Sequence, residues 1–386
     1  MRGSFGNHFR LTIFGESHGG AIGMVIDGIP AGTVIGEEDI ARHMARRAPG
    51  NDPTATARKE PDRVKIVSGL FEGRATGAPL CGLIENTNTR SGDYAQLRAK
   101  MRPGHADYAG SVKYMGFNDP RGGGHFSGRI TAPLVFAGSI ARQLLARRGI
   151  TIGAHIAAIE SVEDTPFDAV NVDRATLERL QDSRFPLLAP DREDAMRARV
   201  AEARADCDSV GGVIECAAVG VPAGIGSPFF GSVESVVSQL LFSIPAVKSV
   251  EFGDAAWMAR MRGSQTNDAM AFDGNGRVAC LTNHNGGVTG GITNGMPVVF
   301  RVCVKPTPSI ARAQQTVDLT TGENTTLTIT GRHDPCIVPR AVVVVESALA
   351  IALCELMMDD ASTRELKEGE LRHEGPFQLP RRNRRD

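Results

Sequence analysis

The feature that most constrains the fold is a short segment that occurs twice. Residues 26–32 read Ile-Asp-Gly-Ile-Pro-Ala-Gly, and residues 218–224 read Ala-Val-Gly-Val-Pro-Ala-Gly. The shift of 192 residues, from 26 to 218, is close to half of the 386-residue chain. Each copy follows an apolar run typical of a strand and precedes a helical pattern, at residues 37–48 and 233–243. This arrangement indicates an internal duplication.

A second helix is predicted in each half, at residues 132–147 and 340–358. The later one is apolar on almost all sides, so we expect other elements to cover it completely. Runs that are rich in β-branched residues and bounded by Gly, Pro or Asn are typical of strands, and they occur at residues 64–70, 80–84, 150–159, 296–304 and 325–330.

These elements favour an α+β fold. The regular strand-helix alternation of a doubly wound parallel sheet does not occur, and most strands are spaced as in hairpins. We therefore predict long helices buried between antiparallel sheets. We expect one domain over residues 1–386, with pseudo-repeats at about 1–160 and 208–360 and a disordered tail at 381–386. The alternative is two unrelated domains joined at residues 160–210.

Composition narrows the function classes. The net charge is -1 and 41% of the residues are hydrophobic, which argues against a disordered chain or a nucleic-acid coat protein. The seven cysteines are scattered and form no Cys-x-x-Cys pair, as in a cytoplasmic protein with reduced thiols. No apolar run reaches 18 residues, and the first residues lack the apolar core of a signal peptide. We expect a cytoplasmic protein with neither membrane nor nucleic-acid partners.

Positive charge gathers in residues 98–148, which contain nine basic and two acidic residues. Such a concentration indicates an anionic ligand. Arg-Pro-Gly-His-Ala-Asp at 102–107 is followed by Arg-Gly-Gly-Gly-His-Phe-Ser-Gly-Arg at 121–129. Glycines allow close approach of the backbone, and guanidinium groups match the oxygens of phosphate and carboxylate. We interpret this region as an anion pocket that contains an acid. A Walker A loop does not occur.

Three further clusters carry polar groups that could take part in catalysis or ligand binding, although each also has a purely structural interpretation. His18 lies in a glycine-flanked turn, where an imidazole suits proton transfer or simply faces solvent. Residues 283–291 and 305–309 combine glycines with hydroxyl and ammonium donors, which suits a phosphate, a flat ring or plain hairpin turns. Residues 331–336 precede the buried helix, where Asp334 could serve as a cap. Their His and Cys lack zinc-site spacing, so we expect no metal.

Together and in this order, the clusters resemble those of the chorismate synthase family. The matching segments are residues 15–19, 27–30, 102–107, 207–212, 250–253, 262–265, 305–307, 332–335 and 346–347. The resemblance implies a β-α-β sandwich with a pseudo-twofold repeat. It also implies a carbon-oxygen lyase that uses reduced FMN for the 1,4-elimination of phosphate from 5-enolpyruvylshikimate 3-phosphate, giving chorismate in the shikimate pathway. The alternatives are a non-flavin acid/base enzyme acting on a phosphorylated sugar acid and, less favoured, an anion- or RNA-binding scaffold.

The resemblance also implies roles for individual residues. His18 corresponds to the histidine that protonates or steadies the reduced flavin, His105 to the one that assists the departing phosphate, and Asp334 to the carboxylate that works through the flavin N5 position. We expect Arg332 to keep Asp334 ionised. The implied FMN contacts are Ser127, Ala246, Gly290, Lys305, Thr307, Ser309 and Arg332. The implied contacts to substrate anions are Arg47, Arg102, Arg129 and Arg332.

Partners follow from the same resemblance. It implies a homotetramer. Some members of the family reduce their own flavin with NADPH, but no dinucleotide-binding Gly-x-Gly-x-x-Gly follows a strand here, so we expect an external flavin reductase. The chain departs from the family pattern at Pro53, His125 and Pro245. We expect the same fold and reaction, and the sequence leaves the effect of these departures on ligand affinity open.

Overall fold

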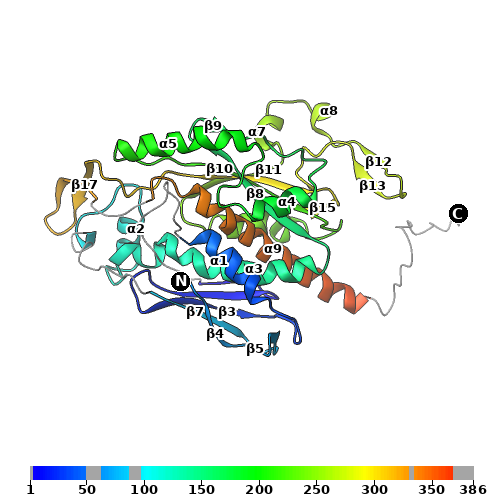
Figure 1. Cartoon of the computed structure of the whole chain (residues 1–386), viewed down its shortest axis with the longest axis horizontal. Coiled ribbons are helices and arrows are strands. Elements are labelled where there is room, and N and C mark those ends of the chain that lie inside the picture. The colour runs from blue at the N-terminus through cyan, green and yellow to red at the C-terminus, as the bar shows by residue number, and fades with distance from the viewer. Residues whose placement is uncertain (1–2, 49–61, 87–96, 330–333, 368–386) are drawn as a thin grey trace, which may run out of the picture.

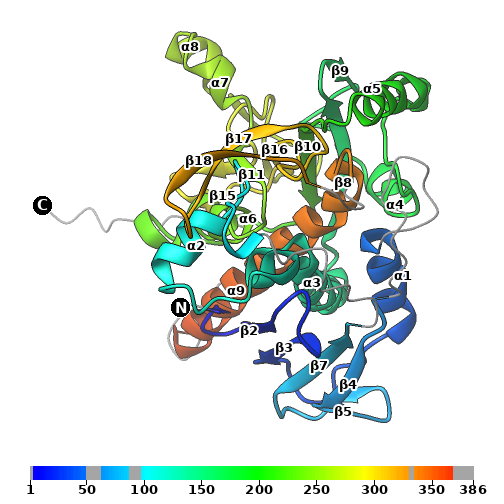
Figure 2. The ribbon, with the colours of Figure 1, turned by 90° about the vertical axis from the view of Figure 1, so that its left-hand side faces the viewer.

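The computed structural model describes residues 3–48, 62–86, 97–329 and 334–367. Two five-stranded antiparallel sheets lie on opposite sides of a layer of helices (Figures 1 and 2). This arrangement confirms the predicted α+β fold, a sandwich in which long helices are buried between antiparallel sheets. The predicted tail at 381–386 lies outside the described residues.

The first sheet is built from the N-terminal part of the chain. Its strands, in spatial order, are β1 (Ser4–Phe5), β2 (Arg10–Gly15), β3 (Ala21–Asp27), β7 (Leu80–Glu85) and β4 (Lys65–Ser68). In the central strand β3, Ile22, Met24 and Ile26 are fully buried, because alternate residues of a strand point to the same face. That face packs on the helices.

The second sheet contains longer and more deeply buried strands. In spatial order they are β9 (Val162–Glu163), β8 (Thr151–Ile159), β10 (Gly212–Val219), β16 (Val298–Val304) and β11 (Val247–Phe252). Four two-stranded hairpins complete the β-structure: β5 (Leu70–Phe71) with β6 (Arg74–Ala75), β12 (Met270–Phe272) with β13 (Val278–Cys280), β14 (Val288–Thr289) with β15 (Ile292–Thr293), and β17 (Gln314–Asp318) with β18 (Glu323–Leu327).

The duplicated segment has the same structural role in both halves. Each copy leaves the central strand of its sheet, β3 or β10, through two glycines in the left-handed region, where a side chain would be strained. Their φ values are 89° at Gly28, 79° at Gly32, 81° at Gly220 and 98° at Gly224. The second glycine then donates its N–H to the second strand of a hairpin, β6 or β15. The distance is 2.8 Å to the carbonyl of Ala75 in one half and 2.8 Å to that of Thr293 in the other. The repeat is therefore structural.

The helix layer follows the same symmetry. α3 (Thr131–Ala146) packs against α9 (Val338–Lys367), while α1 (Glu37–Arg47) packs on α3 and α6 (Val233–Leu241) packs on α9. The contact between α3 and α9 is close, because a Cβ added to Gly138 would lie 2.2 Å from the Cβ of Ser347. α9 is long and apolar enough to cross a membrane by composition, but 89% of its apolar window is buried inside the protein. It is the central core helix, as its all-round apolarity predicted.

One hydrophobic core contains residues from both halves of the chain. β8 ends at Ile159 and pairs with β10, so the last strand before residue 160 belongs to the second sheet. The outer face of that sheet is covered by α4 (Arg174–Gln181), and α5 (Glu193–Ala205) lies near β8 and β9. The remaining helical segments are short: α2 (Asp107–Lys113), η2 (Arg121–Phe126), η3 (Gly128–Ile130), η4 (Pro190–Arg192), η5 (Phe229–Gly231), α7 (Ala255–Met258) and α8 (Gly263–Thr266).

Candidate active site

A cavity of about 590 Å³ lies beside the first turns of α9. Its walls come from segments that are far apart in the sequence: the C-terminal end of α1, the turn before α2, the η2–η3 connection, the segment after α6, the segment after β16 and the start of α9. Its volume falls within the range of ~300–1,000 Å³ typical of small-molecule sites. Among the described residues that line it, six carry a cation and one a carboxylate: Arg47, Arg102, Arg129, Lys248, Lys305 and Arg340, with Asp334.

Most of the residues singled out in the sequence meet in this cavity. Ten of them line it: His105, Asp334, Ser127, Ala246, Lys305, Thr307, Ser309, Arg47, Arg102 and Arg129. His18 does not line it but lies directly behind the wall. A Cβ added to Gly122, which does line the cavity, would come within 2.2 Å of the His18 ring. Glycine at position 122, with φ of 58°, therefore lets the imidazole approach the cavity wall.

Two predicted contacts are not placed in the cavity. Gly290 is exposed in the turn between β14 and β15, and the carbonyl of the adjacent Gly291 accepts the N–H of Val233 at the start of α6. The cavity is lined by residues just beyond the opposite end of α6, such as Phe242. Nine helical residues separate the two ends by about 13 Å, so Gly290 does not reach this cavity within one subunit. Arg332 lies outside the described residues.

The turn before α2 holds an Arg-His-Asp triad. Asp107 accepts hydrogen bonds from Arg102 at 2.7 and 2.8 Å and pairs with Nδ1 of His105 at 2.7 Å. Nη1 of Arg102 also donates to the hydroxyl of Ser309 over 3.2 Å, which ties this turn to the segment after β16. Burial alone would raise the pKa of Asp107, but the hydrogen bonds from Arg102 and His105 lower it well below its ordinary value. Asp107 is therefore a fixed anion beside His105.

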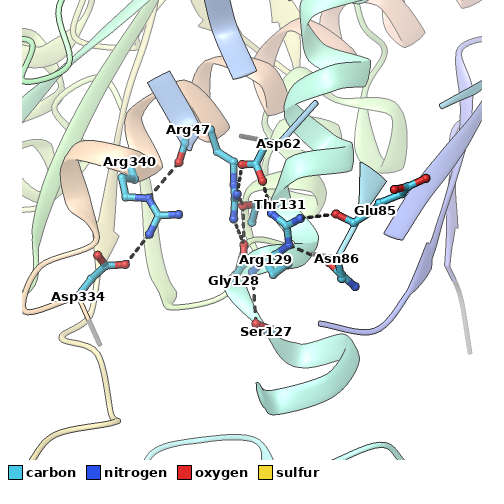
Figure 3. Close-up of polar contacts among 10 residues, drawn as sticks. All are labelled: Arg47, Asp62, Glu85, Asn86, Ser127, Gly128, Arg129, Thr131, Asp334 and Arg340. Carbon is cyan, nitrogen blue, oxygen red and sulfur yellow. Dashed lines mark hydrogen bonds and ion pairs between the residues drawn. The ribbon is translucent and has the colours of Figure 1, made fainter. Parts of the chain in front are cut away.

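A second cluster joins α1 to η3 (Figure 3). Asp62 accepts one hydrogen bond from Arg47 and another from Arg129. The Asp62 side chain is 0% exposed, and those of Arg47 and Arg129 are 5% and 4% exposed. Burial would raise the pKa of Asp62, but the two guanidinium groups lower it below its ordinary value. Sequence reasoning missed Asp62, because a single acid outside all of the recognised motifs carries no signal.

Arg340 holds Asp334, a contact that the sequence did not predict. Nη1 of Arg340 donates to Oδ2 of Asp334 over 2.5 Å, and Nε of Arg340 donates to the carbonyl of Arg47 over 2.9 Å (Figure 3). Burial lowers the pKa of Arg340, and the charge of Asp334 opposes that shift. Sequence reasoning missed Arg340 as well, although its place in the first turn of a helix that follows Asp334 was a usable signal. Arg340 links the carboxylate to the α1 end.

The part of the cavity wall around Lys305 offers hydrogen-bond donors of a different kind. Nζ of Lys305 donates to the carbonyl of Gly104 over 2.5 Å, and its backbone N–H donates to the carbonyl of Ala246 over 2.9 Å. Ala246 has a φ of 75°, which is strained for a residue with a side chain. The Thr307 hydroxyl is buried in the cavity wall without a hydrogen-bond partner among the described residues. An unsatisfied buried hydroxyl in a cavity wall is suited to a polar ligand.

The three departures from the family pattern lie in different places. Pro245 lines the cavity. His125 instead bonds the carbonyl of Gly15 through Nδ1 at 2.8 Å and lines a smaller neighbouring hollow, so it does not face the cavity directly. Pro53 lies outside the described residues. In the described part of the chain, no cluster of three or more His, Cys, Asp or Glu residues could hold a metal ion.

Comparisons with known proteins cover nearly the whole chain. The family model for chorismate synthase matches residues 9–358. A chorismate synthase of Lachnoclostridium phytofermentans is 45% identical over 363 residues, which is 94% of this chain and 96% of that protein. One of Aeropyrum pernix is 46% identical over 361 residues, covering 92% and 93% of the two chains. A crystal structure of a chorismate synthase superposes with a TM-score of 0.71 at 27% identity, over 92% of this chain and 93% of that one.

Proposed function

The chain belongs to the chorismate synthase family, and from that premise we propose that the cavity beside α9 is its active site. The protein is a carbon-oxygen lyase, which converts 5-enolpyruvylshikimate 3-phosphate to chorismate and phosphate. The observation that carries the assignment of the site is the cavity's composition: six cationic side chains, one histidine and one carboxylate among the described lining residues. A substrate with one phosphate and two carboxylates needs such a set.

The cavity also fits a flavin cofactor. The unpartnered Thr307 hydroxyl and the Lys305 ammonium, bonded in the described structure to the Gly104 carbonyl, offer donors to a phosphate or to ring oxygens. Ser127, Ala246 and Ser309 also line the cavity. We assign these five residues to FMN and keep Arg332 as a proposed contact, whereas Gly290 lies too far away to contact a cofactor in this cavity within one subunit. When bound, reduced FMN supplies an electron-rich ring beside the substrate, although the reaction involves no net oxidation.

The chain's own groups divide the remaining work. Arg47, Arg102 and Arg129 bind the substrate anions. His105, held by the fixed anion Asp107 and close to Arg102, is placed to donate a proton or hydrogen bond to the departing phosphate. Asp334, oriented by Arg340, is the carboxylate in the cavity lining that is available when a ring proton is lost. His18, behind Gly122, acts on the cofactor side.

We also propose a cytoplasmic homotetramer served by an external flavin reductase. The outer face of the first sheet supports assembly. There Phe14, Gly23 and Leu83 lie side by side across three strands, and Val67 and Phe71 nearby are 49% and 68% exposed. α4 covers the corresponding face of the second sheet, whereas none of the described helices covers this one (Figure 2). An apolar sheet face without such a cover is suited to contact between subunits.

The function is tested by anaerobic incubation of the purified protein with 5-enolpyruvylshikimate 3-phosphate and photoreduced FMN. Chorismate absorbance and phosphate release are followed together, and oxidised FMN serves as the control. We expect turnover with reduced FMN and none with oxidised FMN. Equal turnover with no flavin would refute the cofactor assignment and favour simple acid/base chemistry. Adding NADPH in place of photoreduction tests the need for an external reductase.

A further inference from the structure

Two of the arginines assigned to the substrate share one buried carboxylate. Arg47 ends α1, and Arg129 lies in η3, 82 residues later (47 to 129), yet Asp62 bonds both (Figure 3). Each carboxylate oxygen takes one arginine: Oδ2 accepts from Nη1 of Arg47, and Oδ1 accepts from Nη1 of Arg129. Asp62 therefore fixes the position of one guanidinium relative to the other.

Uncharged acceptors also orient the two guanidinium groups. Nε of Arg47 donates to the hydroxyl of Thr131 over 3.2 Å, and Nη2 donates to the carbonyl of Gly128 over 3.1 Å. Nε of Arg129 donates to Oδ1 of Asn86 over 3.1 Å. Such acceptors orient each guanidinium but do not offset the repulsion between two buried cations. A shared carboxylate does offset that repulsion.

The backbone conformation at Asp62 also indicates a functional position. Its φ of 47° lies in the left-handed region, which non-glycine residues adopt at a free-energy cost. Strained backbone of this kind persists where the surroundings require it, and it concentrates at functional sites. The pKa of Asp62, lowered by the two arginines, keeps the carboxylate charged at neutral pH. The contact is therefore a permanent part of the site.

We propose that Asp62 is a positioning residue of the substrate-anion site, holding Arg47 and Arg129 side by side so that the two guanidinium groups together receive one anionic group of the substrate. This rests on the proposed function of the cavity. Asp62 itself touches no substrate atom in this role. The competing role is that of a placeholder, in which Asp62 occupies the arginines until the substrate displaces it. The two roles predict opposite changes in substrate affinity when the carboxylate is removed.

The test compares Asp62→Asn with the wild-type protein under the anaerobic assay with reduced FMN. We expect KM for 5-enolpyruvylshikimate 3-phosphate to rise at least tenfold, kcat to change less than threefold and the FMN Kd to change less than twofold. Asp62→Glu, which keeps the charge, should recover part of the affinity. Asp39→Asn is the matched control, because Asp39 pairs with Arg42 on the exposed side of α1. Its KM should stay within twofold of the wild-type value.

A second measurement needs no turnover. Inorganic phosphate should raise the unfolding temperature of the wild-type protein in a concentration-dependent way, and the rise should be much smaller for Asp62→Asn. If the wild-type protein binds phosphate but shows no turnover, the proposed reaction fails while this arm still tests Asp62. A folded Asp62→Asn with unchanged or lower KM and undiminished phosphate response overturns the proposal. If Asp62→Asn does not fold, Asp62→Glu is decisive. Its longer side chain shifts both guanidinium groups, so its KM should stay above the wild-type value, and a wild-type KM together with a wild-type phosphate response overturns the proposal.

Discussion

Glu346 holds together the helix layer beneath the site, and replacing it with Gln should be strongly destabilising. Its carboxylate is 0% exposed and accepts hydrogen bonds from Arg46 at 2.6 and 3.1 Å, from Arg142 at 2.8 Å and from the N–H of Ala154 at 3.0 Å. These contacts join α9 to α1, α3 and β8. Glu346→Gln keeps the shape but leaves two buried guanidinium groups without their anion.

Breaking a buried ion pair from one side costs about 3–5 kcal/mol. With an unfolding entropy of roughly 2.1 cal/mol/K per residue, that cost lowers Tm by about 4–6 °C for a chain of this length. Burial would raise the pKa of Glu346, but Arg46 and Arg142 lower it below the ordinary 4.5. The stabilisation is therefore complete above that ordinary value and is lost as the pH falls through the lower pKa of the folded state. The difference in the free energy of unfolding between the wild-type protein and Glu346→Gln should be complete at pH 7 and should decrease at acidic pH.

Glu355, on the same helix, is the matched control. Its carboxylate accepts only backbone N–H groups in the described structure, those of Asn7, His8 and Phe9, at 2.7, 3.0 and 2.7 Å. Glu355→Gln leaves no buried cation without its anion, and it should lower the free energy of unfolding by about 1–3 kcal/mol. Urea unfolding at pH 7 measures both variants. If Glu346→Gln destabilises no more than Glu355→Gln, or if its effect does not depend on pH, the reasoning about the buried charges is refuted.

Three further predictions concern the cavity. Asp334→Asn should leave the fold and FMN binding intact but slow turnover by about 10²–10⁴-fold, and normal turnover in the anaerobic assay would remove this carboxylate from the chemistry. His105→Ala should slow phosphate release by a similar factor, whereas an unchanged rate would make this histidine a structural one. Ala246→Val should lower the free energy of unfolding by about 1–3 kcal/mol and weaken FMN binding, because a β-branched residue at positive φ is strained. Ala246→Gly should show neither loss, and an equal loss in both variants would point away from backbone strain.

The fold was largely predictable from local patterns. The repeated Gly-x-Pro-Ala-Gly turn, the apolar runs and the all-round apolarity of residues 340–358 depend on the spacing of residues along the chain, and hydrophobic burial then determines the layers. What this pattern could not show was which sheet β8 joins, because pairing with β10 is decided by register between strands more than 50 residues apart.

The sequence by itself also determined which kinds of side chain meet in the cavity, since the motifs bring arginines, His105 and Asp334 into one family pattern. Only the tertiary structure decided how their charges are paired: Asp62 with Arg47 and Arg129, Asp107 with Arg102, and Arg340 with Asp334. It also placed Gly290 at the far end of α6. The physical reason is that ion pairing depends on distances of a few ångström between side chains, and residues up to 300 positions apart, such as Arg46 and Glu346, acquire such distances only through packing.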